Sequence, residues 1–558
     1  MKKTFSTCLV AAMLFGTSAF SQDMTVKETK PPLNWHQLDP STTGYSGISL
    51  DKAYEFLKSK KLKNTRIVVA VIDSGIDTLH EDLKPILWTN PGEIPGNGKD
   101  DDHNGYIDDV HGWNFIGGKD GRNVKEDSYE AARVYHSLKA RWEGKEVNES
   151  SLSAKDKAEY QMFVKSREKV VGDVDQEEAA YIKQIQPKFM LGDAVIRKEL
   201  GKEEYNGNDL KAYSTNNIDA KLTKNIMMGI SKANNSYDIT NQQLIDDLNG
   251  QIRKAESATK APPEYRKDIV KDNENDINDR YYGNNDIMAG TPFHGTHCSG
   301  IIAAVRNNDK GVDGIADNVR IMMVRAVPDG DEHDKDIANA IRYAVNNGAR
   351  VISMSFGKDF SPQKQWVDDA FRYAESKGVL LVHAAGNDHK NVDSTDNFPN
   401  PIYVNGKGKA TNVITVGASG DVKNGGLTAS FSNFGKKEVD VFAPGVNIHS
   451  TVPGVTTYGD ASGTSMACPV VAGVAALILQ YYPNLTPQQL KMAIEKSAQA
   501  PKEKVKLPGT DQQVDLADIS KTGGIVNAYE AVKYASTIQT KKVKQTLPKA
   551  KIRKTKMG

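Results

Sequence analysis

The chain has 558 residues, which is enough for two or more domains with a large core. Its 72 Lys and Arg residues nearly cancel its 71 Asp and Glu residues, so the charge balance indicates no nucleic-acid partner and no attraction to a membrane surface. Hydrophobic residues make up 38% of the chain, an ordinary-to-low share that predicts a polar region somewhere in it.

The first residues are typical of a secretory signal peptide. Two lysines precede a short apolar stretch that starts at Cys8, and small residues before Gln22 offer a cleavage site. The apolar stretch is too short to span a bilayer and no later segment reaches that length, so we expect no integral membrane segment. We therefore predict a signal peptide over 1–21 and an exported protein, extracellular or periplasmic. A lipid anchor on Cys8 is disfavoured because Cys8 opens the apolar stretch instead of following it.

An N-terminal extension over 22–63 begins as a lead-in rich in Pro, Ser, Thr and Gly and ends in a predicted short helix over 49–60. The first strong strand pattern follows it, because residues 66–72 are almost all Ile, Val or Ala and lead to Asp73. Such a run is typical of a buried strand in a parallel sheet. Similar runs lie over 319–324, 351–355, 379–385 and 413–416.

Helical patterns lie between several of these runs, over 336–346 and 364–376. Strands that alternate with helices predict βαβ units, and therefore an α/β fold with a mostly parallel sheet and helices on both faces. Functional groups in such sheets gather beyond the carboxyl ends of the strands, which is where Asp73, Ser355 and Asn387 stand.

The composition changes after about residue 118, where strand patterns vanish and charged and amide residues dominate. Apolar residues there recur at helical spacing, so we predict a polar, mostly helical insertion over 120–279. It divides the parallel-sheet domain into a first part over 64–119 and a second part over 280–538. A lid, a partner-binding element, an internal inhibitor and a polar outgrowth are all open roles for the insertion. The last residues, 539–558, form a basic tail without apolar periodicity.

Three short segments offer an acid, a base and a hydroxyl nucleophile in the order Asp73, His294 and Ser465. A serine hydroxyl becomes a good nucleophile when an imidazole takes its proton and a carboxylate orients that imidazole. The order differs from that of chymotrypsin-like enzymes (His, Asp, Ser) and of α/β-hydrolases (Ser, Asp, His). A helix is predicted over 470–481 with Pro469 in its first turn, which places Ser465 near a helix N-terminus.

These segments resemble the sequence blocks of the subtilisin-like serine proteases, the subtilases. The resemblance covers 64–118 and 280–538 and preserves the order of the blocks. It implies the three-layer subtilisin-like fold, with the insertion added to it. The similar segments are the Asp block over 69–77, the substrate-binding strand over 351–357, the oxyanion segment over 384–387, the His block over 293–300 and the Ser block over 462–469.

The resemblance implies a secreted serine endopeptidase that acts on protein or peptide substrates. It makes Asp73, His294 and Ser465 the catalytic triad, and it makes the Asn387 amide and the Ser465 backbone N–H the donors to the oxyanion. A peptide would pair as an added strand with the groove. The alternative is a catalytically silent binding or assembly protein with the subtilase fold, which would lack one of these groups. The residues expected to line the groove are Ser355, Phe356, Gly357, Ala384, Ala385 and Gly386.

Three acidic residues, Asp329, Asp331 and Glu332, are predicted to flank this groove and to favour basic residues of the substrate.

Structural calcium has two predicted places. In the first, Asp100, Asp102 and Asn104 follow the spacing of the start of an EF-hand loop, although His111 stands where the bidentate Glu would be. A solvated acidic turn is the alternative interpretation of that segment. The resemblance implies the second place, at Asp82 and Asn308, where the loop that carries Asn308 is about one residue longer than in subtilisin itself.

Two cysteines remain after the signal peptide, Cys298 and Cys468, and each lies within four residues of a predicted catalytic group. We expect both to be small buried residues. A disulfide between them is an alternative, because an exported protein meets an oxidising compartment. A metal site that joins them to His294 and His297 is a further, disfavoured alternative.

Overall fold

The computed structural model describes residues 31–539 except 173–175, 234–236, 238, 291, 407 and 424–425. The predicted signal peptide over 1–21, with Cys8, and nearly all of the predicted basic tail lie outside the described residues.

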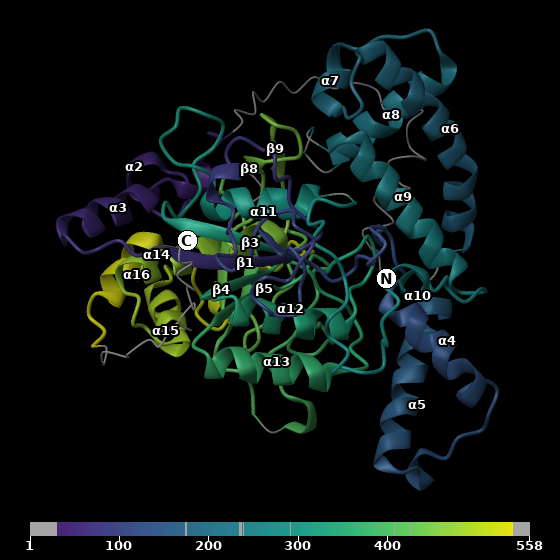
Figure 1. Ribbon diagram of the computed structural model, residues 1–558. Coiled ribbons are helices and arrows are strands. Elements are labelled where there is room, and N and C mark those ends of the chain that lie inside the picture. The colour runs from purple at the N-terminus through teal and green to yellow at the C-terminus, as the bar shows by residue number, and fades with distance from the viewer. Residues whose placement is uncertain are drawn as a thin grey trace, which may run out of the picture.

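A sheet of seven strands lies at the centre of the molecule, and every pair of neighbouring strands in it is parallel (Figure 1). Helices cover both faces of this sheet, so the predicted α/β fold class is confirmed. The two outer strands, β2 and β7, were not predicted as strands. In the order of the sheet the strands are β2 (Gly112–Asn114), β3 (Val319–Arg325), β1 (Ile67–Asp73), β4 (Val351–Met354), β5 (Leu380–Ala384), β6 (Val413–Ser419) and β7 (Val441–Pro444).

Each face of the sheet has its own hydrophobic core. On one face lie α11 (Phe293–Ala303) and α14 (Thr464–Tyr481), and on the other lie α12 (Asp334–Asn346) and α13 (Lys364–Ser376). Successive residues of β1 belong alternately to the two cores, as the two-residue period of a strand requires. Apolar side chains therefore fill most of both faces of the sheet.

The predicted N-terminal extension is part of the folded body. Its helix α3 packs against α16, and the Ala528 N–H donates to the Ile48 carbonyl at 2.7 Å. The helices near the two ends of the described chain, α3 and α16, therefore lie on the side of the sheet away from the insertion (Figure 1). The further elements are α2 (Pro40–Thr43), α3 (Leu50–Ser59), α15 (Pro487–Ser497), α16 (Ala528–Ala535), β8 (Ile448–Thr451), β9 (Tyr458–Ala461), β10 (Val505–Lys506) and β11 (Gln513–Val514).

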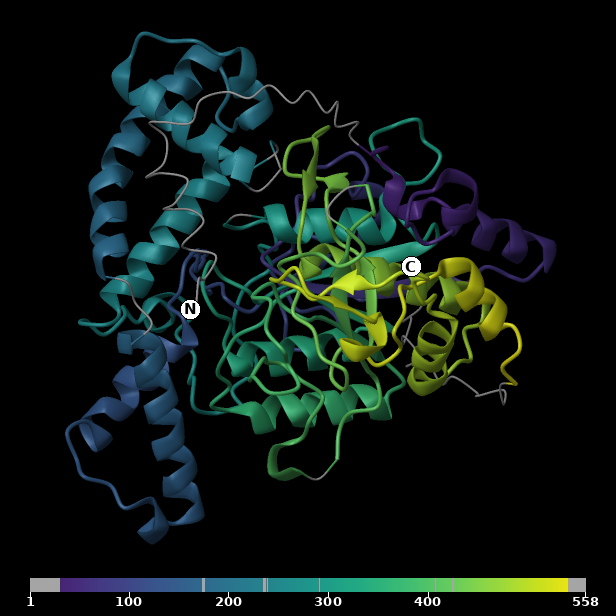
Figure 2. The same ribbon diagram turned by 180° about the vertical axis from the view of Figure 1, so that it is seen from behind.

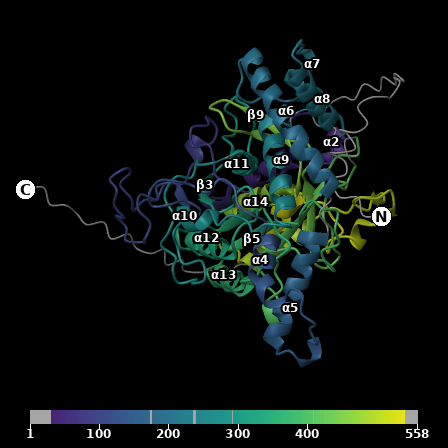
Figure 3. The ribbon, with the colours of Figure 1, turned by 90° about the vertical axis from the view of Figure 1, so that its right-hand side faces the viewer.

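The insertion forms two helical lobes along one side of the sheet domain, as Figures 1 and 2 show from opposite directions. From that side, the lobe of α4 and α5 lies below and the lobe of α6 to α9 lies above (Figure 3). The core of the first lobe includes Phe360 from the loop after β4, whereas the second lobe has a core of its own. The helices are α4 (Glu130–Trp142), α5 (Ala154–Arg167), α6 (Gln176–Leu200), α7 (Gly207–Ala212), α8 (Ile218–Ala233), α9 (Asn241–Glu256) and α10 (Tyr265–Ile269).

The two ends of the insertion meet at the buried ring of His333. Its Nε2 bonds to Asp127 just before α4 at 3.1 Å, and its Nδ1 bonds to Glu274 after α10 at 2.7 Å. Both partners are carboxylates, so both ring nitrogens donate and the ring is an imidazolium. One cation in the loop before α12 therefore holds both ends of the insertion.

One helix in the described part of the chain, α14, is long and apolar enough to cross a bilayer. It is 89% buried inside the protein, so it is the central core helix and gives no clear sign of a membrane segment.

Candidate active site

The predicted triad residues lie where three elements of the fold begin or end. Asp73 ends β1, His294 is the second residue of α11, and Ser465 is the second residue of α14. The two helices pack against each other, which brings their N-terminal turns together at the carboxyl edge of the sheet. A Cβ on Gly295 would lie 2.2 Å from the Gly75 carbonyl, so only glycine allows α11 to approach the end of β1 this closely.

The imidazole of His294 is oriented by Asp73. Its Nδ1 lies 2.8 Å from Asp73 Oδ1, which also accepts the Ser74 N–H at 2.8 Å. With Nδ1 donating to the carboxylate, Nε2 of the neutral ring keeps its lone pair. Burial disfavours the imidazolium, but the charge of Asp73 and the hydrogen bond to it outweigh burial and raise the pKa of His294. The pair is therefore arranged to accept a proton at Nε2.

Ser465 and Ser355 exchange two hydrogen bonds at the end of β4. The Ser465 hydroxyl donates to the Ser355 carbonyl at 3.2 Å, and the Ser355 hydroxyl donates to the Ser465 carbonyl at 2.9 Å. Among the described residues, the Ser465 hydroxyl thus bonds to a backbone carbonyl and not to His294. A hydroxyl turns about one bond, so it can move from the carbonyl to the imidazole when a substrate binds.

Pro469 explains why the Ser465 carbonyl is available. The helix was predicted over 470–481 with Pro469 in its first turn, but α14 starts at Thr464 and Pro469 lies inside it. A proline has no N–H to give to the carbonyl four residues earlier, which here is that of Ser465. The Ser355 hydroxyl and the Cys298 thiol, at 3.4 Å, donate to this carbonyl instead. The helix continues through the proline because its lost hydrogen bond is replaced.

The two predicted oxyanion donors face one small space. Asn387 Oδ1 accepts the N–H and the hydroxyl of Thr464, both at 2.9 Å, which turns Nδ2 of the amide the other way. A Cβ added to Gly463 would lie 3.5 Å from both Asn387 Nδ2 and the Ser465 backbone nitrogen. The space lies at the N-terminus of α14, whose dipole favours negative charge. Two N–H donors and a helix terminus can stabilise an oxyanion there.

The predicted groove residues extend two neighbouring strands of the sheet. Ser355 to Gly357 follow β4, and Ala384 to Gly386 lie at the end of β5, which pairs with β4. Ser355, Ala384 and Ala385 are buried, Phe356 and Gly386 are half-buried, and Gly357 is exposed. The Ala385 carbonyl already accepts Nδ2 of Asn433 at 2.8 Å. Ser355 to Gly357 are therefore the more accessible edge for an incoming peptide.

Both cysteines are free and fully buried, so the alternative of a disulfide between Cys298 and Cys468 is wrong. Burial raises the pKa of the Cys468 thiol to about 11 and that of Cys298 well above its usual value. Ligand atoms of Cys298, Asp73 and His294 lie within 4.8 Å of one another, a grouping that excludes His297 and Cys468. The described residues thus do not assemble the four-residue metal site that was considered.

Residues of the insertion form hydrogen bonds or ion pairs with the three acidic residues that are predicted to favour basic substrates. Asp329 forms an ion pair with Arg253 of α9 at 2.8 Å. Asp331 accepts the Glu130 N–H at 2.8 Å, and Glu332 is 2% exposed. Asp329 and Asp331 are only half-buried, so the preference for basic substrate residues stays a prediction, although contact with the insertion was not foreseen from the sequence.

The first predicted calcium place gathers oxygen ligands. Carboxylate oxygens of Asp100, Asp102 and Glu93 lie within 4.8 Å of one another, and Asn104 donates to Asp102 at 3.1 Å. Sequence reasoning missed Glu93, because it precedes the loop and no spacing rule includes it. Burial, together with the neighbouring charges of Asp102 and Asp100, raises the pKa of Glu93. A set of three carboxylates fits a hard cation such as calcium.

The second predicted calcium place fits less well. Asp82 is fully buried, and its carboxylate accepts Nδ2 of Asn308 and, at 2.8 Å, the Tyr458 hydroxyl. Asn308 thus presents its NH₂ group to Asp82, while its oxygen accepts the Lys310 N–H at 3.1 Å. A single carboxylate with an amide NH₂ turned toward it does not supply the set of oxygen ligands that calcium takes.

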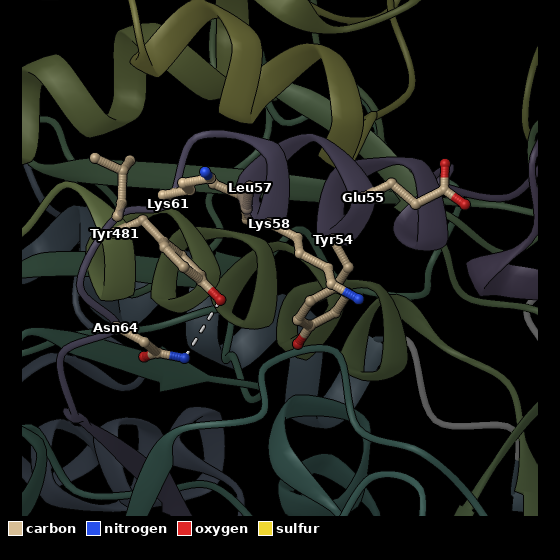
Figure 4. Close-up of a pocket in the computed structure, with 8 residues that line it drawn as sticks. Tyr54, Glu55, Leu57, Lys58, Lys61, Asn64 and Tyr481 are labelled. Carbon is tan, nitrogen blue, oxygen red and sulfur yellow. Dashed lines mark hydrogen bonds between the residues drawn. The ribbon is translucent and has the colours of Figure 1, made fainter.

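A surface pocket between α3 and α14 is not part of this site (Figure 4). The Tyr481 hydroxyl, which accepts Nδ2 of Asn64 at 3.3 Å there, belongs to the last residue of the helix whose second residue is Ser465. At 1.5 Å per residue, the length of α14 separates them by about 24 Å.

Known proteins are similar in sequence to this chain. The sequence profile of the subtilase family matches residues 64–516. A thermophilic serine proteinase of Bacillus sp. strain AK1 is 41% identical over 242 residues, which are 43% of this chain and 52% of that protein. Thermitase of Thermoactinomyces vulgaris is 38% identical over 243 residues, 43% of this chain and 75% of thermitase. An extracellular protease of Xanthomonas campestris pv. campestris is 36% identical over 274 residues, 45% of this chain and 43% of that protein. The chain thus spans about half the length of the first and third of these relatives.

Proposed function

This chain belongs to the subtilase family, and from that membership we propose that it is a serine endopeptidase that hydrolyses peptide bonds in proteins or peptides. The observation that carries the proposal is that Asn387 Nδ2 and the Ser465 backbone nitrogen both lie 3.5 Å from one point, the Cβ position of Gly463, with Ser465 Cβ 3.7 Å from the same point. Two N–H donors beside a serine hydroxyl at a helix N-terminus are the arrangement that stabilises the oxyanion of acyl transfer.

In the proposed mechanism, the Ser465 hydroxyl leaves the Ser355 carbonyl and attacks the peptide carbonyl while His294 Nε2 takes its proton. Asp73 holds the ring and stabilises the imidazolium, which the 2.8 Å contact and the raised pKa of His294 support. Asn387 Nδ2 and the Ser465 N–H stabilise the oxyanion. His294 then gives its proton to the leaving amine, and a water repeats the sequence to release the acyl group.

The substrate is proposed to pair with Ser355 to Gly357 as an added strand. Gly357 is exposed and has no side chain, so an extended peptide can approach its backbone. The relatives include a protein named as an extracellular protease, which supports the proposal that this chain is exported as well.

Structural calcium is proposed at Glu93, Asp100 and Asp102, with Asn104 beside them. Their carboxylates converge, and a cation there would remove their mutual repulsion and stabilise the loop before β2. The ion would have a structural role only.

The test of the proposed function compares wild type with Ser465→Ala. Hydrolysis of casein and of short peptides is measured, together with covalent labelling by a serine-directed fluorophosphonate. Loss of the nucleophile is expected to lower kcat by about 10³-fold or more and to abolish labelling. Equal activity of the two proteins, or an inactive and unlabelled wild type, would overturn the proposal and favour the silent binding protein.

A further inference from the structure

A cavity of about 520 Å³ lies between the first lobe of the insertion and two loops of the sheet domain. One wall is a face of α5, where Ala158 and Met162 stand one turn apart and Val164 adds a further apolar side chain. The opposite wall contains Phe360, from the loop after β4, and Phe398, from the loop after β5. The cavity thus exists only because the insertion packs here.

Apolar and polar side chains line the cavity together, and most of its accessible lining is apolar. Val164 is 43% exposed and Met162 and Phe398 are half-buried, which leaves apolar surface open to a ligand. Two ion pairs cross from the insertion to the loops, Lys165 with Asp396 at 2.7 Å and Lys169 with Asp359 at 2.8 Å. The remaining charged lining residue, Glu149, lies 3.8 Å from Lys157 within the insertion. Because these charges are paired, the cavity suits an apolar side chain better than an ion.

The cavity continues the proposed substrate strand. Directly after Gly357, Lys358 pairs with Phe398 through two backbone hydrogen bonds of 2.9 Å. A Cβ on Gly357 would lie 3.2 Å from the Phe398 carbonyl, so the wall of the cavity begins where the accessible strand ends. The next residues, Asp359 and Phe360, line the cavity itself. At about 3.3 Å per residue, an extended peptide that pairs with Ser355 would reach this wall after about four to six residues.

We propose that this cavity is a distal subsite that binds an apolar side chain of the peptide substrate, such as Leu or Phe, several residues away from the scissile bond. The inference rests on the proposed endopeptidase function and gives the insertion a role in substrate selection. Binding far from the reacting bond lowers KM, and it raises kcat only where that energy positions the scissile bond.

The test uses two sets of fluorogenic peptides. A short peptide spans only the residues next to the scissile bond, and longer ones add six residues at either end with a terminal Leu or Asp. For the wild type, a longer peptide with Leu at one end is expected to have a KM about 10-fold below that of the short peptide and of its Asp counterpart, the size expected for burial of a large apolar side chain at an open site.

The variant Ala158→Trp fills the cavity from an exposed helical position. It is expected to abolish the advantage of the Leu peptide and to leave kcat/KM of the short peptide unchanged. The matched control is Ala154→Trp, also an exposed alanine of α5 but outside the cavity lining, which is expected to keep the advantage.

Two outcomes separate the two proposals. If the wild type does not cleave even the short peptide, the proposed function fails and the subsite fails with it. If the short peptide is cleaved but Leu at neither end lowers KM, or if Ala158→Trp behaves like Ala154→Trp, the function stands and the distal subsite is overturned.

Discussion

Gly463 keeps open the space between the two proposed oxyanion donors. Its φ of 160° is extended backbone, so an alanine there meets no backbone strain. The added Cβ would contact both donor nitrogens at 3.5 Å and occupy part of the space meant for the oxyanion. For Gly463→Ala we expect kcat to fall about 10- to 100-fold with KM little changed, because the lost interaction forms only in the transition state.

Steady-state kinetics on a short peptide measure this effect, with Gly459→Ala as the control. Gly459 lies on β9, where a Cβ would meet only Val452 at 3.4 Å, so its kcat should match wild type. An unchanged kcat in Gly463→Ala would place the oxyanion elsewhere.

The candidate catalytic residues were predictable because each of them lies in a short contiguous sequence segment that identifies it. Asp73, His294, Ser465 and Asn387 each sit in such a segment, and the structure places their side chains at one edge of the sheet. Glu93 was not predictable, because its meeting with Asp100 depends on how the loop folds back. Residue types and local spacing thus indicate the proposed chemistry, whereas long-range polar contacts require the fold.

Among the elements, both ends of the insertion bind one buried cation, His333. Burial and Arg133 lower the pKa of His333, but hydrogen bonds to Asp127 and Glu274 outweigh them and raise it. A raised pKa in the folded state means that the stabilising contribution is fully present below about pH 6.5 and is lost as the pH rises through the folded pKa. We expect His333→Gln to lower the free energy of unfolding by about 1–3 kcal/mol at pH 5.5 and by less at pH 9.

Chemical unfolding of both proteins at the two pH values measures this difference. Hydrogen exchange of the amides over 123–130 and 271–280 locates it, because those segments carry the two carboxylate partners. A destabilisation that is the same at pH 5.5 and pH 9 would contradict a charged His333.

The predictability of the elements follows their burial. Interior strands such as β1 and β5 are long apolar runs, and their predicted limits agree with the structure within about two residues. The edge strand β2 has three residues and no such run, so only its pairing with β3 defines it. The start of α14 was misplaced because a proline usually marks a first turn, whereas here side chains from two other elements replace its missing hydrogen bond.

At the scale of the whole molecule, the proposed calcium site is coupled to the body of the fold. Asp109, at the end of the acidic loop, accepts the Tyr343 hydroxyl of α12 at 2.6 Å, so the loop and the sheet domain should unfold together. Saturating calcium is expected to raise Tm by about 5 °C relative to protein in chelator, and Glu93→Gln is expected to abolish most of that shift.

Differential scanning calorimetry with and without chelator gives the shift, and Asn308→Ala is the matched variant at the other candidate place. It should keep the calcium shift of the wild type. A shift lost in Asn308→Ala but kept in Glu93→Gln would move the ion to Asp82, and no shift in the wild type would remove both places.

The contact of both insertion ends with one imidazole ring has an evolutionary consequence. The two ends of the insertion contact the same side chain, so they lie close together in space. A change in the length of the segment between them therefore need not displace any strand of the sheet domain. Such a segment can be gained, shortened or exchanged while the proposed catalytic residues stay in place. We therefore expect chains with this same acid, base and nucleophile to differ most in what they carry between positions 127 and 274.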